Sequence, residues 1–135
     1  MDYGAAMVKL SGSRATVALR LFVPCTWALM EHGLQSFQSL GEREGMMFPS
    51  GEWPREEPIP MWMAAVSFDL AMLWIGADGV IRDIEITAPG DPATYDHRGL
   101  YVIEANADLA SELGLLPGNA RATLSWLDPC PGGRR

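Results

Sequence analysis

Short runs of apolar and β-branched residues recur along the chain and predict a series of β-strands. The run from Leu70 to Ile75 contains no polar residue, which is typical of a strand that is buried on both faces. The run from Val80 to Thr87 alternates charged and aliphatic residues, so one face of this strand is expected to meet solvent. The predicted strands cover residues 15–22, 45–48, 61–66, 68–75, 80–87, 100–105 and 120–126.

Two segments have the apolar spacing of short helices. Pro24 precedes the first segment, where its fixed φ angle suits the opening turn, and apolar residues then recur on one face. The second segment covers residues 107–113, with Asn106 as its N-cap and Gly114 suited to the position just after the helix. The apolar stripe of the first helix consists of Trp27, Met30, Leu34 and Phe37.

About seven strands and two short helices predict a β-dominated α+β fold, in which the helices pack on a small barrel or sandwich. Residues 14–127 are expected to form this single domain, with 1–13 as a weakly ordered lead-in and 128–135 as a flexible tail. Segments 49–60 and 88–99 contain several prolines and glycines and are predicted to be loops. Long loops on a rigid scaffold commonly carry binding residues, so both are candidate functional segments.

The charge of the chain limits the class of partner. Its formal net charge is −7, with basic residues scattered along the sequence, so binding to nucleic acid or to an anionic membrane surface is disfavoured. The apolar stretch 59–75 is interrupted by Pro60, Ser67 and Asp69, which argues against a membrane span. The N-terminus lacks the pattern of a signal peptide, and the protein is therefore expected to be cytoplasmic.

Cys25 and Cys130 are the two cysteines of the chain, and they lie far apart without metal-finger spacing. They are expected to be unrelated thiols, with Cys25 packed and Cys130 in the tail. A disulfide between them is the less favoured alternative. No cofactor is expected, because the sequence contains neither a glycine-rich nucleotide loop nor a Cys/His metal motif.

A set of weak motifs occurs in one order along residues 15–125. Together they resemble the prokaryotic family called domain of unknown function 192. The resemblance implies a compact, β-dominated α+β fold and no particular reaction, since that family has no established one. The motifs are, in order, Leu29-Met30, Gly45-Met46-Met47-Phe48, Trp62-Met63, Ala77-Asp78-Gly79, Val102-Ile103-Glu104, Leu113-Gly114-Leu115 and Pro117-Gly118.

The most polar part of the family pattern is missing from this chain. Members of the family typically read Trp-Met-Lys-Asn-Thr, whereas residues 64–66 of this chain are Ala-Ala-Val. Members also carry a Leu-Asp pair where this chain has Leu70 and Ala71, and Asp69 lies two positions before Ala71, on the same face of a strand. The resemblance therefore implies that any activity of that polar cluster is lost or altered here.

Large aromatic side chains beside the two predicted loops are the leading candidate for a site. Trp53 lies in the first loop, and Trp62 and Met63 lie at the start of the strand that follows it. An aromatic groove rimmed by long loops suits a small molecule or a peptide. The leading hypothesis is a non-catalytic binding or interaction module, whose partner is an unidentified small molecule or protein.

Two other hypotheses stay open. Asp69 and Glu104 occur in apolar strands, and a shared pocket would make them the carboxyl pair of a hydrolase or a carbohydrate-active enzyme. Met61 and Met63 would share a strand face, and with His32 they would offer the soft ligands that select copper(I). An exposed strand edge would also permit a homodimer.

Overall fold

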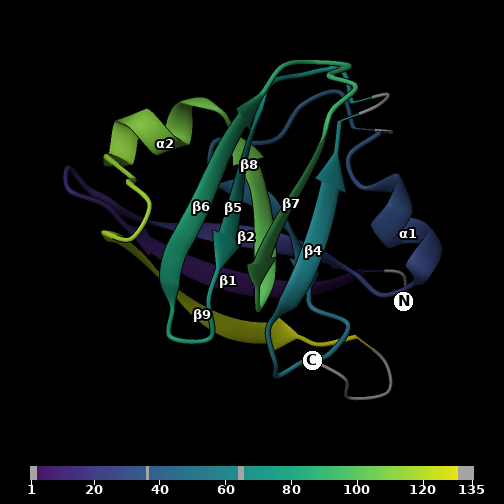
Figure 1. Cartoon of the computed structure of the whole chain (residues 1–135), viewed down its shortest axis with the longest axis horizontal. Helices are drawn as coiled ribbons and strands as arrows, with labels where there is room; N and C mark the ends of the chain where they lie inside the picture. The colour runs from purple at the N-terminus through teal and green to yellow at the C-terminus, as the bar shows by residue number, and fades with distance from the viewer. Residues whose placement is uncertain (1–2, 36, 64–65, 131–135) are drawn as a thin grey trace.

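Seven strands close into a barrel at the centre of the structure (Figure 1). The computed structural model describes residues 3–35, 37–63 and 66–130. Neighbouring barrel strands are antiparallel except for β2 and β3, and the pairing of β1 with β9 closes the barrel. In barrel order the strands are β1 (Tyr3–Ser11), β2 (Thr16–Pro24), β3 (Glu44–Pro49), β8 (Tyr101–Asn106), β5 (Leu70–Ile75), β6 (Val80–Thr87) and β9 (Ala120–Asp128).

Two hydrophobic cores lie on opposite faces of the same barrel strands, because successive side chains of a strand point to opposite faces. On β5, Leu73 belongs to the core inside the barrel, whereas its neighbours Met72 and Trp74 belong to the core outside it. On β8, Ile103 is inside and Val102 is outside. All six residues of β5 are buried, which confirms the prediction of a strand covered on both faces.

A separate two-stranded sheet covers the outer face of the barrel (Figure 1). It consists of β4 (Glu57–Trp62) and β7 (Thr94–Gly99), which run antiparallel with Ile59 opposite His97. The indole N–H of Trp74, on β5, donates a hydrogen bond to the carbonyl of Ile59 at 2.9 Å. This bond links the covering sheet to the barrel within the core that lies outside the barrel, which is called the second core below.

Two short helices lie outside the barrel. The first, α1 (Trp27–His32), begins after Thr26, whose hydroxyl accepts a hydrogen bond from a backbone N–H of the first turn at 3.2 Å. It ends at Gly33, where φ is 54°, so it is shorter than the predicted stripe to residue 37. The second, α2 (Asp108–Leu113), ends as predicted before Gly114, which has a left-handed backbone. Within the described ranges, no helix is long and apolar enough to cross a membrane.

Three segments that were predicted to be irregular are strands. Residues 3–11 form β1, and the prediction of a weakly ordered lead-in is wrong. Small residues weaken its strand signal, but pairing with β2 on one side and β9 on the other stabilises it. The predicted loops 49–60 and 88–99 supply β4 and β7, which pair with each other. Pro58 and Pro60 fit β4 because this strand has a single neighbour, so a missing N–H can face away from the ladder.

Cys25 and Cys130 form a disulfide, so the prediction of two unrelated thiols is wrong. Their Cα atoms are 5.3 Å apart, although 105 positions separate them in the sequence. β1 pairs with both β2 and β9, and this brings Pro24 and Asp128 close to the start of β1 and to each other. Cys130 is buried, so residues 128–130 are a fixed part of the domain, and residues 131–135 of the predicted tail lie outside the described residues.

Candidate functional site

A pocket of about 320 Å³ lies between α1 and β4, above the outer face of the barrel. Figure 1 shows α1 next to β4 at the edge of the covering sheet. Trp27 and His32 line the pocket from α1, and Met61 and Trp62 line it from β4. Glu104, from the barrel strand β8, forms its floor. Residues of the predicted first loop and of the predicted first helix line this cavity together.

Glu104 is a buried carboxyl without a partner. It lies on the outward face of β8, opposite Met46 of β3 on one side and Met72 of β5 on the other. The residue is only 2% exposed, and its Oε1 atom has no hydrogen-bond partner among the described residues. A β-carbon at Gly33 would lie 3.9 Å from this oxygen, so the end of α1 packs close to the carboxyl.

Burial raises the pKa of Glu104 from 4.5 to about 8. The cause is desolvation, since the charged form loses its hydration and gains no neighbouring cation in return. Glu104 is therefore mostly protonated at neutral pH. A protonated carboxyl donates one hydrogen bond and accepts others, so the floor of the pocket offers a ligand both kinds of contact.

The mouth of the pocket is aromatic and acidic. Trp27 is 73% exposed and Trp62 is 38% exposed, although both are large apolar side chains. Glu31 and His32 of α1 and Glu57 of β4 also line the pocket. Among the lining residues within the described ranges there is neither Lys nor Arg. Such a surface attracts cations and repels anions.

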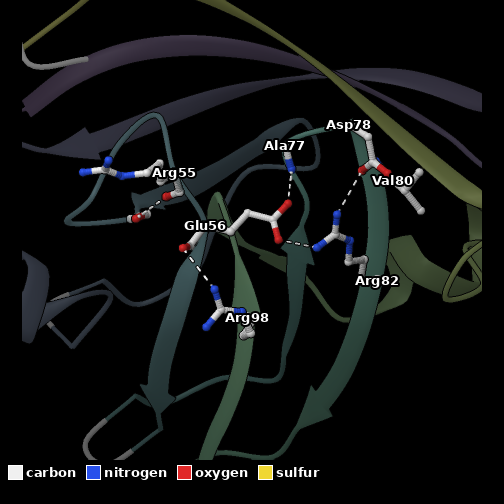
Figure 2. A network of polar contacts seen from close by, with 8 residues as sticks. Arg55, Glu56, Ala77, Asp78, Val80, Arg82 and Arg98 are labelled. Atoms are coloured by element: carbon white, nitrogen blue, oxygen red, sulfur yellow. Dashed lines mark hydrogen bonds and ion pairs between the residues drawn. The ribbon is translucent and has the colours of Figure 1, made fainter.

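A network of polar contacts fixes the start of β4 against the turn between β5 and β6, as Figure 2 shows. The carboxylate of Glu56 accepts a hydrogen bond from the N–H of Ala77 at 2.7 Å and forms an ion pair with Arg82. Arg98 of β7 donates a hydrogen bond to the backbone carbonyl of Glu56 at 3.3 Å. The hydrogen bond from the Ala77 N–H is the largest cause of the lowered pKa of Glu56, and the hydrogen bond from Arg82 is the second largest. The β4 wall of the pocket is thus anchored to the barrel at this end.

The three residues of the predicted groove do not share one surface. Trp62 lines the pocket, whereas Met63 is fully buried in the second core. Trp53 packs elsewhere, with its ring centroid 6.3 Å from that of Tyr101 and 5.9 Å from that of Trp126. Of the predicted groove, only Trp62 remains at the site. The departure from the family pattern at Ala64 and Ala65 lies outside the described residues.

The residues of the two other hypotheses are also divided. Asp69 is exposed and lines a separate cavity, so it does not share a pocket with Glu104. Met61 and His32 line the pocket together, but Met63 does not. No group of three His, Cys, Asp or Glu residues suited to a metal ion occurs in the described part of the chain.

Trp27 and Gly33 are among the site residues that were not predicted. The helical spacing assigned Trp27 to an apolar stripe that runs to Phe37, but α1 ends at Gly33 after six residues, and Trp27 is exposed at the pocket mouth. The signal for this arrangement was present in the sequence, because glycine commonly ends a helix. A helix that stops at Gly33 cannot present a stripe as far as Phe37.

Comparisons with known proteins identify a family and a fold. The family model DUF192, described as "Uncharacterized ACR, COG1430", matches residues 8–121. A proposed transcription regulator from Sinorhizobium meliloti has a similar structure, with a TM-score of 0.80 and 31% identity, covering 91% of this chain and 95% of that chain. A protein of unknown function from Novosphingobium aromaticivorans gives a TM-score of 0.78 and 25% identity, covering 88% of this chain and 84% of that chain. No curated protein matches the sequence.

Proposed function

The chain belongs to the uncharacterised family DUF192, and we propose that it is a binding protein whose small-molecule ligand occupies the pocket between α1 and β4. The observation that carries this proposal is the unpartnered Oε1 of Glu104 on the pocket floor. A buried polar atom without a partner destabilises a fold by about 1–3 kcal/mol. A ligand that bonds to Glu104 would remove this penalty, which gives the residue a reason to be there.

The size and lining of the pocket favour a small molecule over a protein partner. Its volume of about 320 Å³ lies at the lower end of the range of about 300–1,000 Å³ that is typical of ligand sites. Its walls are mostly apolar or aromatic, and Glu104 is a single polar group at the bottom. This combination is typical of a site that binds an organic molecule and orients it through one polar contact.

The two other hypotheses have less support. A carboxyl pair must act on the same substrate, and Asp69 and Glu104 line different cavities. Copper(I) would require several soft ligands at one point, and Met63 does not line the pocket that Met61 and His32 line. Neither hypothesis explains why two tryptophans are exposed at the pocket mouth.

The Sinorhizobium protein is described as a proposed transcription regulator, which raises the question of whether this chain binds DNA. Direct DNA binding by this chain is disfavoured, because its net charge is −7 and phosphate contacts require clustered lysine or arginine side chains. The disulfide bears on location instead. Disulfides persist mainly in oxidising compartments, so the Cys25–Cys130 bond favours such a compartment.

Thermal unfolding with a panel of organic amines, alcohols, sugars, nucleotides and metal salts tests the proposal. A ligand at about 100 times its dissociation constant adds roughly 2.7 kcal/mol of stability, which raises the midpoint by several degrees. The Trp62→Ala variant is expected to lose the shift while remaining folded, because Trp62 is partly exposed. Leu127→Ala is the matched control, since Leu127 is also an exposed apolar residue but does not line the pocket. A ligand that shifts wild type and Trp62→Ala equally would contradict the proposed site.

A further inference from the structure

The floor and the mouth of the pocket favour the same class of ligand. Resting on the proposed function, we infer that the ligand carries a positively charged amine or quaternary ammonium group, which pairs with Glu104 as this residue gives up its proton. The inference concerns the charge of the ligand. A neutral ligand in the same pocket would leave the proposed function intact and overturn only this step.

The first argument is the environment of the Glu104 carboxyl. Met46 and Met72 occupy the facing positions on the two neighbouring strands and offer it no strong donor. Oε1 is buried beneath the end of α1, where a β-carbon at Gly33 would lie 3.9 Å from it, and Glu104 is among the residues that line the pocket. A carboxyl in such a place must either keep a proton or meet a cation, because an isolated buried carboxylate is strongly unfavourable. The described residues that line the pocket include neither Lys nor Arg to pair with it.

The second argument is the composition of the mouth. An ammonium group entering the pocket would pass Trp27 and Trp62, and the faces of tryptophan rings attract cations. Glu31 and Glu57 add negative charge to the same opening. Exposed aromatic side chains together with carboxylates are how proteins commonly recognise quaternary ammonium groups. An anionic ligand would meet repulsion from the carboxylates at the mouth.

The proton balance of the binding step follows from this arrangement. Protonated Glu104 and the free cation become a carboxylate–cation pair, and the released proton passes to the buffer. The charged groups facing this event are Glu31 and His32 from α1 and Glu57 from β4, whereas the flanking strands contribute Met46 and Met72. A quaternary ammonium ion has no proton to lose, so any pH dependence of its binding must come from the protein.

Choline and its neutral isostere 3,3-dimethyl-1-butanol provide the test. Binding is measured by tryptophan emission and by calorimetry in buffers of different ionisation enthalpy. Choline is expected to bind wild type about tenfold more tightly for each unit by which pH rises toward about 8, then to level off, with release of about one proton near neutral pH. The neutral isostere is expected to bind at least about tenfold more weakly above this pH and to release no proton.

Two variants make the result specific. Glu104→Gln keeps the shape of the protonated side chain, so it should fold, bind choline at least about tenfold more weakly, and show no proton release. Glu31→Gln removes one carboxylate at the mouth and should keep the proton release. Choline binding that Glu104→Gln leaves unchanged, or no choline binding to wild type at millimolar concentration, overturns the inference. Equal binding of the alcohol to wild type, lost in Trp62→Ala, overturns it as well and supports the proposed function.

Discussion

Glu104 on β8 lies directly opposite Met72 on β5, and both side chains are buried on the outer face of the barrel. Antiparallel partners of this kind have β-carbons about 4.5–5.5 Å apart, so a methionine is the closest lateral neighbour of the carboxyl. A thioether is at most a weak acceptor and cannot stabilise a carboxylate. Burial among these apolar side chains accounts for the raised pKa of Glu104.

The first prediction is that stability falls as pH rises from about 5 to 8. The pKa of Glu104 is raised from 4.5 to about 8 in the folded chain, so the folded state holds this proton where the unfolded state has lost it. The stabilisation is complete below pH 4.5, the pKa of Glu104 in the unfolded chain. It is lost as pH rises through about 8, the pKa of Glu104 in the folded chain. The total change is roughly 5 kcal/mol, at about 1.4 kcal/mol for each unit of pKa shift.

Urea unfolding across this pH range measures the effect in wild type, Glu104→Gln and Glu31→Gln. Glu104→Gln should be less sensitive to pH and more stable than wild type above about pH 8, since its amide does not ionise. Glu31 is exposed, and Glu31→Gln should keep the wild-type profile. A Glu104→Gln profile that parallels wild type would show that this carboxyl is hydrated or paired.

The second prediction concerns the disulfide. Cys25 and Cys130 are 105 positions apart, so their bond closes most of the chain into one loop. Removing such a bond lowers the free energy of unfolding by about 2–5 kcal/mol. The double variant Cys25→Ala, Cys130→Ala should therefore unfold at lower urea concentration than the oxidised protein. Reduced wild type should behave like this variant.

Thiol labelling provides a direct check on the same bond. The chain has two cysteines, and both are in the disulfide. The unreduced protein should take up no alkylating reagent even in denaturant, and the reduced protein should take up two equivalents per chain. Labelling of the denatured, unreduced protein would mean that the bond does not form in the sample.

Much of the fold could be predicted because the relevant signals are local. The apolar run of β5 and the alternation of β6 identify both strands, and Asp78 and Gly79 mark the turn between them. Gly79 has a φ of 82°, a backbone conformation that glycine adopts without strain. These features depend on neighbours in the sequence, so periodicity and turn residues were sufficient.

The missed elements depend on distant partners. β1 is rich in small residues and is stabilised by pairing with β2 and β9. β4 contains two prolines and pairs only with β7, which is itself a short, charged strand. The disulfide depends on the same closure of the barrel. Sequence patterns find Glu104 as a polar residue in an apolar strand, whereas the exposure of Trp27 depends on how α1 sits on the barrel, which no local pattern gives.

The third prediction concerns the attachment of the covering sheet. The indole of Trp74 donates a hydrogen bond to the Ile59 carbonyl at 2.9 Å within the second core. Trp74→Phe removes the donor and leaves a buried carbonyl unsatisfied, which should lower the free energy of unfolding by about 1–3 kcal/mol. Hydrogen exchange should accelerate in β4 and β7 more than in β5. Trp27→Phe is the control, because Trp27 is exposed and has no such bond to lose.

The fourth prediction concerns the anchor at the start of β4. Glu56 accepts the Ala77 N–H and pairs with Arg82, and these contacts lower its pKa below 4.5. A carboxyl group with a lowered pKa in the folded protein stabilises the fold when pH is above its pKa in the unfolded chain. This stabilisation is lost as pH falls through its pKa in the folded protein. Glu56→Ala should therefore destabilise the protein at neutral pH, by about 1 kcal/mol for a partly exposed pair, and should reduce its loss of stability in acid.

Arg82 contacts both Glu56 and Asp78, and Asp78→Ala tests whether the contact with Asp78 matters for the position of β4. Asp78 also faces Arg82, at 3.5 Å, but it does not contact β4, so its removal should leave hydrogen exchange at the start of β4 close to wild type. Glu56→Ala should accelerate exchange there and should weaken any ligand that binds between α1 and β4, because the wall formed by β4 is no longer fixed to the barrel. Equal exchange in the two variants would show that Arg98 and the Trp74 bond are sufficient to hold this wall.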